Sequence, residues 1–127
     1  MQKTAIQTKQ APAPIGPYSQ AIRSGNFLFV SGQVAINPAT GELNNADVVT
    51  EATQVMHNLQ AILTEAGMDF SHVVKTTIFL SDMSLFTTVN EVYGSFFNGT
   101  VFPARETIAA KGLPRNVQVE ISMIAMQ

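Results

Sequence analysis

Alternation of hydrophobic and polar residues is the first pattern that stands out along the chain. Side chains of a strand point to opposite faces at successive positions, so alternation over a few residues predicts a strand. The turn residues Gly25-Asn26 separate two such runs. This pattern predicts strands in four segments of the first two thirds of the chain: a short polar edge strand within 1–10, then 19–24, 27–34 and 73–80.

The segment 27–34 carries no charged residue on either face of the predicted strand. One face holds the apolar residues Leu28, Val30 and Val34 together with Gly32, and the other holds Phe27, Phe29, Ser31 and Gln33. We therefore expect both faces to be covered, one by helices and the other by another subunit. The internal Gly32 indicates a bulge or a close approach of the backbone.

Apolar residues at helical spacing predict two helices. The first begins after Asp47, which is suited to capping a helix N-terminus, and runs to about Ala66, where Gly67 closes it. The second is expected to begin at Asp82 or Ser84 and to end at Phe97. His57 falls outside the apolar stripe of the first helix, so we expect its side chain to be solvated, and we expect His72 at the surface.

The C-terminal stretch 102–126 contains two further alternating runs, at 102–108 and 117–121, around a turn at Gly112-Leu113-Pro114. Their proximity in sequence predicts a hairpin, which would bring Arg105 near Glu120 on a common face. Two interpretations fit this pairing. It forms either a structural ion pair, or a site in which arginine holds a small carboxylate and glutamate takes a proton from water.

The order of the predicted elements is β-β-β-α-β-α-β-β. This order is typical of an α+β domain with a mixed sheet and both helices on one face. We expect residues 1–127 to form a single domain, long enough to bury a full core.

The charge content adds an expectation about assembly. Only 13% of the residues are charged, about half of the usual share in soluble domains. So little charge leaves too few residues for a fully solvated surface, so we expect an oligomer. The net charge of −2 and the scattered lysines and arginines argue against nucleic acid as a partner.

Several kinds of chemistry find no support in the sequence. The chain has no cysteine, which excludes disulfides, thiolate nucleophiles and cysteine-based metal sites. No phosphate-binding glycine-rich loop, histidine–glutamate metal spacing or GxSxG motif is present. Residues 1–14 show no apolar run, so we expect neither a signal peptide nor a membrane span and place the protein in the cytoplasm. A reaction without a cofactor or a metal, based on an anion anchor, a carboxylate and hydroxyl groups, remains open.

Seven motifs together closely resemble the Rid family of YjgF-type reactive intermediate deaminases, in the same order and over nearly the whole chain. They are Gly16-Pro17-Tyr18-Ser19-Gln20-Ala21, Val30-Ser31-Gly32-Gln33, Asn37-Pro38-Ala39-Thr40-Gly41, Val74-Lys75-Thr76-Thr77, Phe86-Thr87-Thr88-Val89-Asn90, Phe102-Pro103-Ala104-Arg105 and Val119-Glu120-Ile121.

The resemblance implies a chorismate-mutase-like α+β fold and a homotrimer with sites between its subunits. It also implies the hydrolysis of 2-imino and enamine acids to 2-oxo acids and ammonia without a cofactor. Substrates of this class are 2-aminoacrylate, 2-iminopropanoate and 2-iminobutanoate. Two other functions stay open at this point. Some relatives have been described as endoribonucleases or translation inhibitors, and a non-catalytic sensor of 2-oxo acids would use the same pocket.

The resemblance also assigns roles to individual residues. Arg105 matches the arginine that grips the substrate carboxylate, and Glu120 matches the glutamate that activates water. The other matching positions are the polar site residues Tyr18, Ser31 and Asn90, and Gly32, whose backbone approaches the ligand. In a mechanism built on Arg105 and Glu120, Tyr18 with water is one route for returning a proton, the other being Glu120 itself.

Two positions depart from the family pattern. Thr107 stands where many relatives have cysteine, and strand alternation predicts its side chain in the pocket beside Arg105. Glu106 replaces a small residue, and we expect it on the opposite face, where it affects packing more than chemistry.

Overall fold

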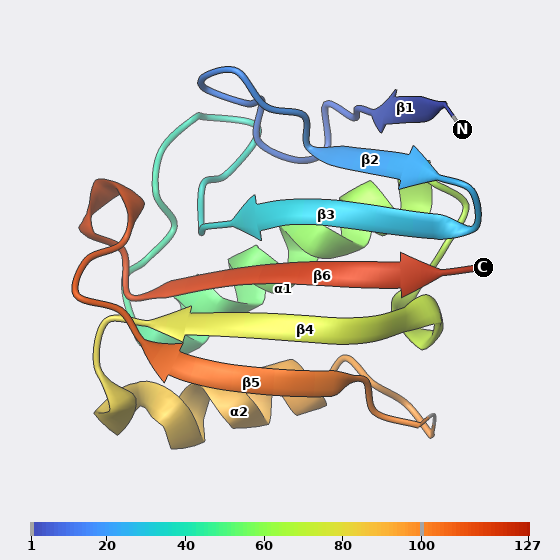
Figure 1. Cartoon of the computed structure of the whole chain (residues 1–127). Helices are drawn as coiled ribbons and strands as arrows, with labels where there is room; N and C mark the ends of the chain where they lie inside the picture. Colours follow the sequence, from blue (N-terminus) through green and yellow to red (C-terminus); the bar gives the residue numbers. More distant parts are fainter. Residues whose placement is uncertain (1, 100) are drawn as a thin grey trace.

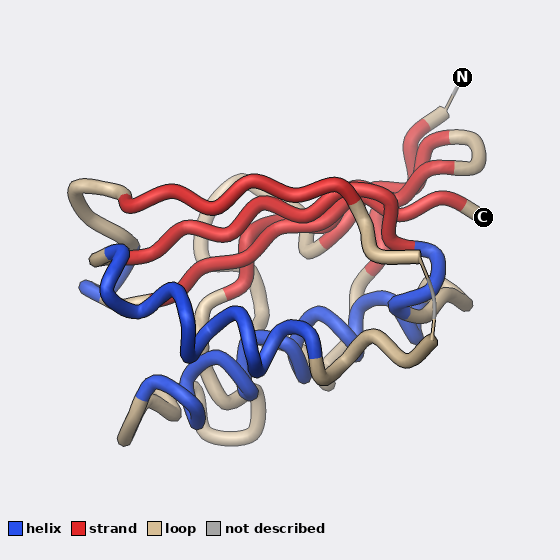
Figure 2. Tube along the Cα trace, turned by 90° about the horizontal axis from the view of Figure 1, so that it is seen from below, coloured by secondary structure: helices blue, strands red, loops and turns tan. Residues whose placement is uncertain are grey.

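Six strands form one mixed sheet, and helices cover only one of its faces (Figures 1 and 2). The structure is a computed structural model that describes residues 2–99 and 101–127. Across the sheet the strand order is β1-β2-β3-β6-β4-β5. The strands are β1 Lys3–Ile6, β2 Ala21–Ser24, β3 Phe27–Gln33, β4 Val73–Leu80, β5 Ala104–Ala109 and β6 Val119–Met126, and the helices are α1 Val48–Glu65 and α2 Phe86–Gly94. The predicted α+β architecture is confirmed.

Helix α1 begins and ends where its capping residues predict. The Asp47 carboxylate accepts a hydrogen bond of 2.7 Å from the Thr50 amide, which satisfies a free donor of the first turn. At the other end Ala66 is the C-cap, and Gly67 follows with a φ of 75°, a left-handed conformation that glycine adopts without strain. His57 is exposed on this helix, as expected.

Helix α2 is shorter than the periodicity predicts. Asp82 caps a short 3₁₀ turn, Met83–Leu85, that leads into the helix, and the helix ends at Gly94 rather than Phe97. Beyond Gly94 the chain turns so that the Phe97 ring packs 4.8 Å from the ring of Tyr93. The amides of Phe96 and Phe97 bond to the carbonyls of Tyr93 and Gly94, so the backbone continues beyond the helix as tighter turns.

A bulge in β3 changes which residues face the core. The register between β3 and β6 shifts between Val30 and Gln33, so that Gln33 is buried although strict alternation predicts it beside Phe29. The same shift moves Gly32 away from the face of Leu28 and Val30, where alternation predicts it, and brings it against Glu120. Both features suggested by Gly32, a bulge and a close approach, are present.

The predicted hairpin of the C-terminal stretch is wrong. β5 pairs only with β4, in parallel, and β6 lies between β3 and β4, antiparallel to both. A parallel neighbour requires a crossover, which α2 supplies between β4 and β5. The chain then passes β4 and places β6 in the middle of the sheet, where it hydrogen-bonds on two sides instead of one.

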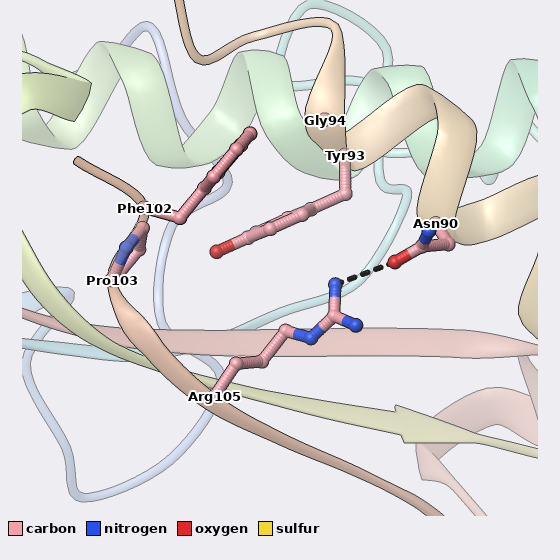
Figure 3. A pocket seen from close by; sticks show the side chains of 6 residues that line it. All are labelled: Asn90, Tyr93, Gly94, Phe102, Pro103 and Arg105. Atoms are coloured by element: carbon pink, nitrogen blue, oxygen red, sulfur yellow. Dashed lines mark hydrogen bonds between the residues drawn. The ribbon is translucent and has the colours of Figure 1, made fainter. Parts of the chain in front are cut away.

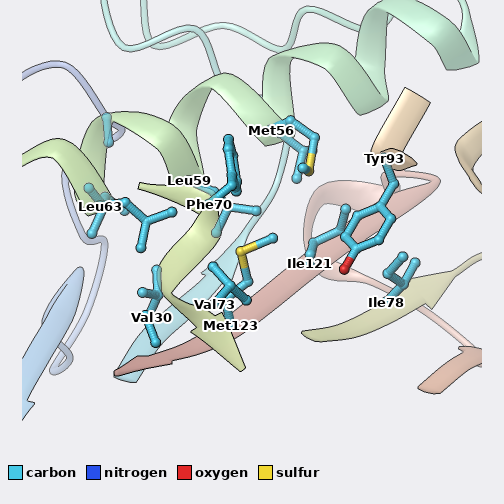
Figure 4. Packing of buried hydrophobic residues seen from close by; sticks show 14 of the residues in the cluster. Val30, Met56, Leu59, Leu63, Phe70, Val73, Ile78, Tyr93, Ile121 and Met123 are labelled. Carbon is cyan, nitrogen blue, oxygen red and sulfur yellow. The ribbon is translucent and has the colours of Figure 1, made fainter. Parts of the chain in front are cut away.

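The core lies between the sheet and the helices (Figure 4). Val30, Ile78, Ile121 and Met123 point from β3, β4 and β6 toward side chains such as Leu59 of α1 (Figure 4). The opposite face of the sheet has no covering element in the described part of the chain (Figure 2). Phe27 and Phe29, which stack on each other there, remain 41% and 46% exposed.

No helix within the described ranges combines the length and the apolar character needed to cross a bilayer.

The open face of the sheet predicts self-association. Phe29→Glu places a charge on the exposed ring position without touching the core, so it should weaken assembly while the chain stays folded. Sedimentation should give three times the 13.7 kDa chain mass for the unmodified protein and a smaller mass for this variant. Val49→Glu makes the same change at an equally exposed apolar residue of α1 and should leave the mass unchanged. A single-chain mass for the unmodified protein at micromolar concentration would contradict the prediction.

Candidate functional site

Arg105 lies in a pocket between β5 and α2 (Figure 3). The pocket has a volume of about 440 Å³ and lies on the helix side of the sheet. Arg105 pairs with the buried Thr76 of β4 and points to the same face of the sheet, so its side chain reaches toward α2. The residues that line the pocket are Asn90, Tyr93, Gly94, Phe102, Pro103 and Arg105.

The Arg105 guanidinium is held in place by neutral groups. Its Nη1 donates a hydrogen bond of 2.8 Å to Oδ1 of Asn90 (Figure 3). Its central carbon lies 5.1 Å from the ring centre of Tyr93 and 5.7 Å from that of Phe86, within the range of cation–π attraction. Burial raises the pKa of Tyr93, so its phenol stays neutral, and its hydroxyl donates to Thr76.

No carboxylate of the described residues lies within ion-pair distance of Arg105. An arginine that is oriented but lacks an anionic partner keeps the donors of its planar fork for a ligand. The site can therefore bind a small carboxylate.

Glu120 lies on the other face of the sheet, in a second cavity of about 550 Å³. Its carboxylate packs directly over Gly32, since a Cβ atom built on that glycine would lie 2.1 Å from Oε2 of Glu120. The side chain is half-buried, and this burial raises the pKa of the Glu120 carboxyl. A carboxyl with a raised pKa holds its proton more tightly than an ordinary glutamate, which favours a role in proton transfer.

Tyr18, Ser31 and Gly32 line the same cavity as Glu120, so the structure brings these four predicted site residues together. The proline-rich segment that precedes Tyr18 is anchored by the buried Gln20, whose side-chain amide bonds the backbone of Thr8, Ala11 and Pro12. The Ser31 hydroxyl donates to the carbonyl of Ser19 at 2.6 Å. The Tyr18 ring remains 52% exposed at the edge of the cavity.

Arg105 and Glu120 do not share a face, contrary to the prediction from the hairpin. Arg105 contacts α2 on the helix side, whereas Glu120 sits between the buried residues Val119 and Ile121 and so points to the open side. Strand β4 also separates their two strands. Within one chain they form no ion pair, so the interpretation of a structural ion pair across a hairpin is wrong.

The two positions that depart from the family pattern behave differently. Glu106 lies on the face opposite to Arg105, as predicted, where Thr77 donates to it at 2.7 Å and Lys75 lies 3.1 Å away. The hydrogen bond from Thr77, followed by that from Lys75, lowers the pKa of Glu106. Thr107 pairs with the buried Ile78 and so lies on the same face as Arg105, as strand alternation predicts. Its hydroxyl is buried without a hydrogen-bond partner among the described residues, and it is not among the residues that line the Arg105 pocket in the single chain.

Sequence reasoning missed the aromatic half of the Arg105 pocket. Tyr93 is buried and Phe86 packs against the core, yet both rings also contact the guanidinium. Phe86, Asn90 and Tyr93 follow the spacing i, i+4, i+7 and therefore share one helix face. This spacing was available as a signal for an arginine site.

The chain thus combines a one-sided α+β sheet with an arginine pocket on the helix side and a glutamate cavity on the open side. The chain belongs to the family described as Endoribonuclease L-PSP, whose model matches residues 8–127. This match, together with the similarity to a Rid family protein given below, confirms the Rid family that the sequence motifs predicted.

Individual relatives cover almost the whole chain. Protein DfrA of Myxococcus xanthus is 51% identical over 99% of this chain and 97% of its own length. The 2-iminobutanoate/2-iminopropanoate deaminase of Mus musculus is 48% identical over 98% of this chain and 92% of its own. The crystal structure of YyfA, a Rid family protein from Yersinia pestis, superposes on this chain with a TM-score of 0.97 and is 44% identical in sequence. The match covers 99% of this chain and 100% of YyfA.

The contact between Gly32 and Glu120 predicts that a substitution at Gly32 lowers activity without lowering the stability of the fold. In Gly32→Ala the new methyl group collides only with the end of a flexible side chain, which moves away at low cost. Thermal unfolding should therefore change little, whereas any activity that needs Glu120 should fall by an order of magnitude or more. Gly112→Ala, where an added Cβ meets nothing within 4 Å, is the matched control. Equal activity of both variants would show that the position of Glu120 is unimportant.

Proposed function

We propose that this protein is a cofactor-independent deaminase of 2-imino acids, with 2-iminopropanoate and 2-iminobutanoate as its substrates. It hydrolyses them to the 2-oxo acid and ammonia. The observation that carries the proposal is the state of Arg105, a guanidinium fixed by Asn90 and two aromatic rings that has no carboxylate partner in the described part of the chain. The name of the mouse relative supports the same reaction.

The complete site requires two copies of the chain. Arg105 binds the carboxylate and Glu120 acts on water, but the two lie on opposite faces of one sheet and cannot reach one substrate. In the proposed homotrimer, the Arg105 pocket of one subunit faces the Glu120 cavity of the next. The exposed Phe27 and Phe29 and the low charge content support an assembly through the open sheet face.

The reaction proceeds by addition of water to the C=N bond. Arg105 holds the substrate carboxylate and so orients the neighbouring imine carbon. Glu120 accepts a proton from a water molecule as the water oxygen bonds to that carbon, and the imine nitrogen takes up a proton from a second water molecule. The nitrogen of the resulting carbinolamine then takes the proton held by Glu120 and leaves as ammonia, while the hydroxyl proton returns to the second water and the C=O bond of the 2-oxo acid forms.

The exposed phenol of Tyr18 lies beside Glu120 and provides, with water, a path for the returning proton. Ser31 and the backbone of Gly32 bound the same space. Imines already hydrolyse in water, so positioning together with one acid–base group gives a useful acceleration.

RNA cleavage is the second function to test, because the family description names an endoribonuclease. The two histidines do not favour it. His57 is exposed on α1 against Phe96, and Nδ1 of His72 accepts the Asp69 amide in a local cap. Neither lines the Arg105 pocket or the Glu120 cavity.

Ammonia release from enzymatically generated 2-iminopropanoate tests the proposal, with RNA degradation measured in parallel on the same preparation. We expect the protein to accelerate ammonia release and to leave RNA intact. Binding of 2-oxo acids without any acceleration would indicate a sensor instead. RNA cleavage that survives Arg105→Ala, without deamination, would replace the proposal altogether.

Arg105→Lys tests the carboxylate anchor. Lysine keeps the positive charge but loses the planar fork, so binding of the imino acid should weaken by about 1–3 kcal/mol. Steady-state kinetics measure this as a fall in kcat/KM. Arg23→Lys, at an arginine that bonds the Ala66 carbonyl away from both cavities, is the matched control and should keep normal kinetics. Unchanged kinetics in Arg105→Lys would rule out the anchor.

The raised pKa of Glu120 predicts the pH dependence of turnover. Only the ionised carboxylate accepts a proton, so kcat should rise with pH as Glu120 loses its proton. Because burial raises its pKa, this rise should lie above the ordinary glutamate value of about 4.3. A pH–rate profile measures it. Glu120→Gln should bind 2-oxo acids normally and lose the turnover, whereas an unaltered profile in that variant would exclude Glu120 as the base.

A further inference from the structure

Glu51 is a buried carboxylate that plays no part in the proposed reaction. It lies in the first turn of α1 and is 1% exposed. One oxygen, Oε2, accepts hydrogen bonds from two successive amides where β6, the strand that carries Glu120, begins: at 2.8 Å from Gln118, just before the strand, and at 3.0 Å from Val119, its first residue. The other oxygen, Oε1, is buried and has no partner among the described residues.

The two amides lie where β6 has lost one of its neighbours. The last pair between β3 and β6 joins Gln33 to Ile121, so the backbone before Ile121 has no strand on that side. The Glu51 carboxylate takes the place of this missing strand. On the other side the carbonyl of Gln118 accepts the Ser81 amide at 3.0 Å, so the peptide groups just before Glu120 are held from both directions.

The approach to this point is strained. Arg115 and Asn116 both have a φ of 55°, a left-handed conformation that is unfavourable for arginine and better tolerated by asparagine. The hydrogen bonds from Gln118 and Val119 to Glu51 hold the backbone where it leaves this turn and β6 begins.

A core carboxylate with one unpartnered oxygen is a poor means of stabilising a fold, since the desolvation of that oxygen is not compensated. Its Oε2, by contrast, accepts two hydrogen bonds from consecutive amides, a geometry that fixes a backbone accurately. Glu120 follows directly, and its carboxylate must lie within the small space that Gly32 leaves open.

We propose that Glu51 is a positioning residue for the Glu120 half of the site, holding the peptide groups of Gln118 and Val119 so that the Glu120 carboxylate lies over Gly32. The inference rests on the proposed deaminase function. It adds that α1, which lines neither the Arg105 pocket nor the Glu120 cavity, determines the efficiency of the water-activating step.

Three variants of the assembled protein separate positioning from stability. Glu51→Ala removes the acceptor. Glu51→Gln keeps one oxygen that accepts both amides but places an amide group where Oε1 has no partner, so it loses stability without losing the acceptor. Leu63→Ala, at the far end of α1, lowers stability through a core cavity and leaves residues 118–120 untouched.

The readouts are kcat, KM, the inhibition constant of 2-oxobutanoate and the melting temperature. In Glu51→Ala we expect kcat to fall about 10- to 100-fold, the effect of a misplaced catalytic group, with the inhibition constant within about twofold because Arg105 is unaffected. Glu51→Gln and Leu63→Ala should both melt earlier yet keep kcat within about threefold. A kcat that follows the melting temperature across the three variants would overturn the proposal.

Two controls keep this outcome apart from a failure of the deaminase function. If Glu120→Gln abolishes turnover in the same assay but Glu51→Ala does not, the positioning role is wrong and the deaminase stands. If the unmodified protein shows no turnover, the deaminase proposal fails. Amide hydrogen exchange of residues 117–121 then tests whether Glu51 holds this part of the backbone. Exchange should become fast in Glu51→Ala and stay slow in Glu51→Gln and Leu63→Ala. Slow exchange in all three would reject the hydrogen-bonded anchor itself.

Discussion

Side chains of a strand alternate between the two faces of its sheet, and this geometry governs the whole molecule because helices cover only one face. On β5 the alternation turns Arg105 toward α2, and on β6 it turns Glu120 away from the core. Arg105, the proposed anchor for a carboxylate, and Glu120, the group proposed to activate water, are therefore both present in each chain but separated by the sheet. The same geometry leaves Phe27 and Phe29 exposed on the open face. A second copy that covers this face would supply the half of the site that each chain lacks.

Each half of the site depends on contacts that hold one charged group in one place. Asn90 and Tyr93 orient Arg105 from α2, so the guanidinium does not have to be ordered when the ligand arrives. On the other face, the bulge in β3 places Gly32, which has no side chain, against the Glu120 carboxylate. Helix α1 contributes through Glu51, which bonds the backbone just before Glu120. Both helices thus serve the site as well as the core.

Local patterns predicted most of the elements, and the reasons for the exceptions are physical. The cap at Asp47 and the left-handed Gly67 define α1 through interactions within a few residues, so its ends could be predicted. The strands that pair with β6 could not be predicted, because the sequence of residues 102–126 does not indicate that β6 lies between β3 and β4. Because the hairpin was predicted wrongly, Glu120 was also predicted on the same face of the sheet as Arg105. Residues that match the family motifs were found from the sequence, whereas the contacts of Tyr93 and Glu51 depend on the packing of helices against distant strands.

Complementation between two inactive variants tests the division of the site between subunits most directly. One chain carries Arg105→Ala and the other Glu120→Gln, and the two are unfolded together, refolded in equal amounts and checked for mixed assemblies. A site built from two neighbours is intact wherever the first chain supplies Glu120 and the second supplies Arg105, so deamination should return to about a quarter of the unmodified rate. Each variant refolded alone should stay inactive. Mixed assemblies without activity would contradict a site shared between subunits.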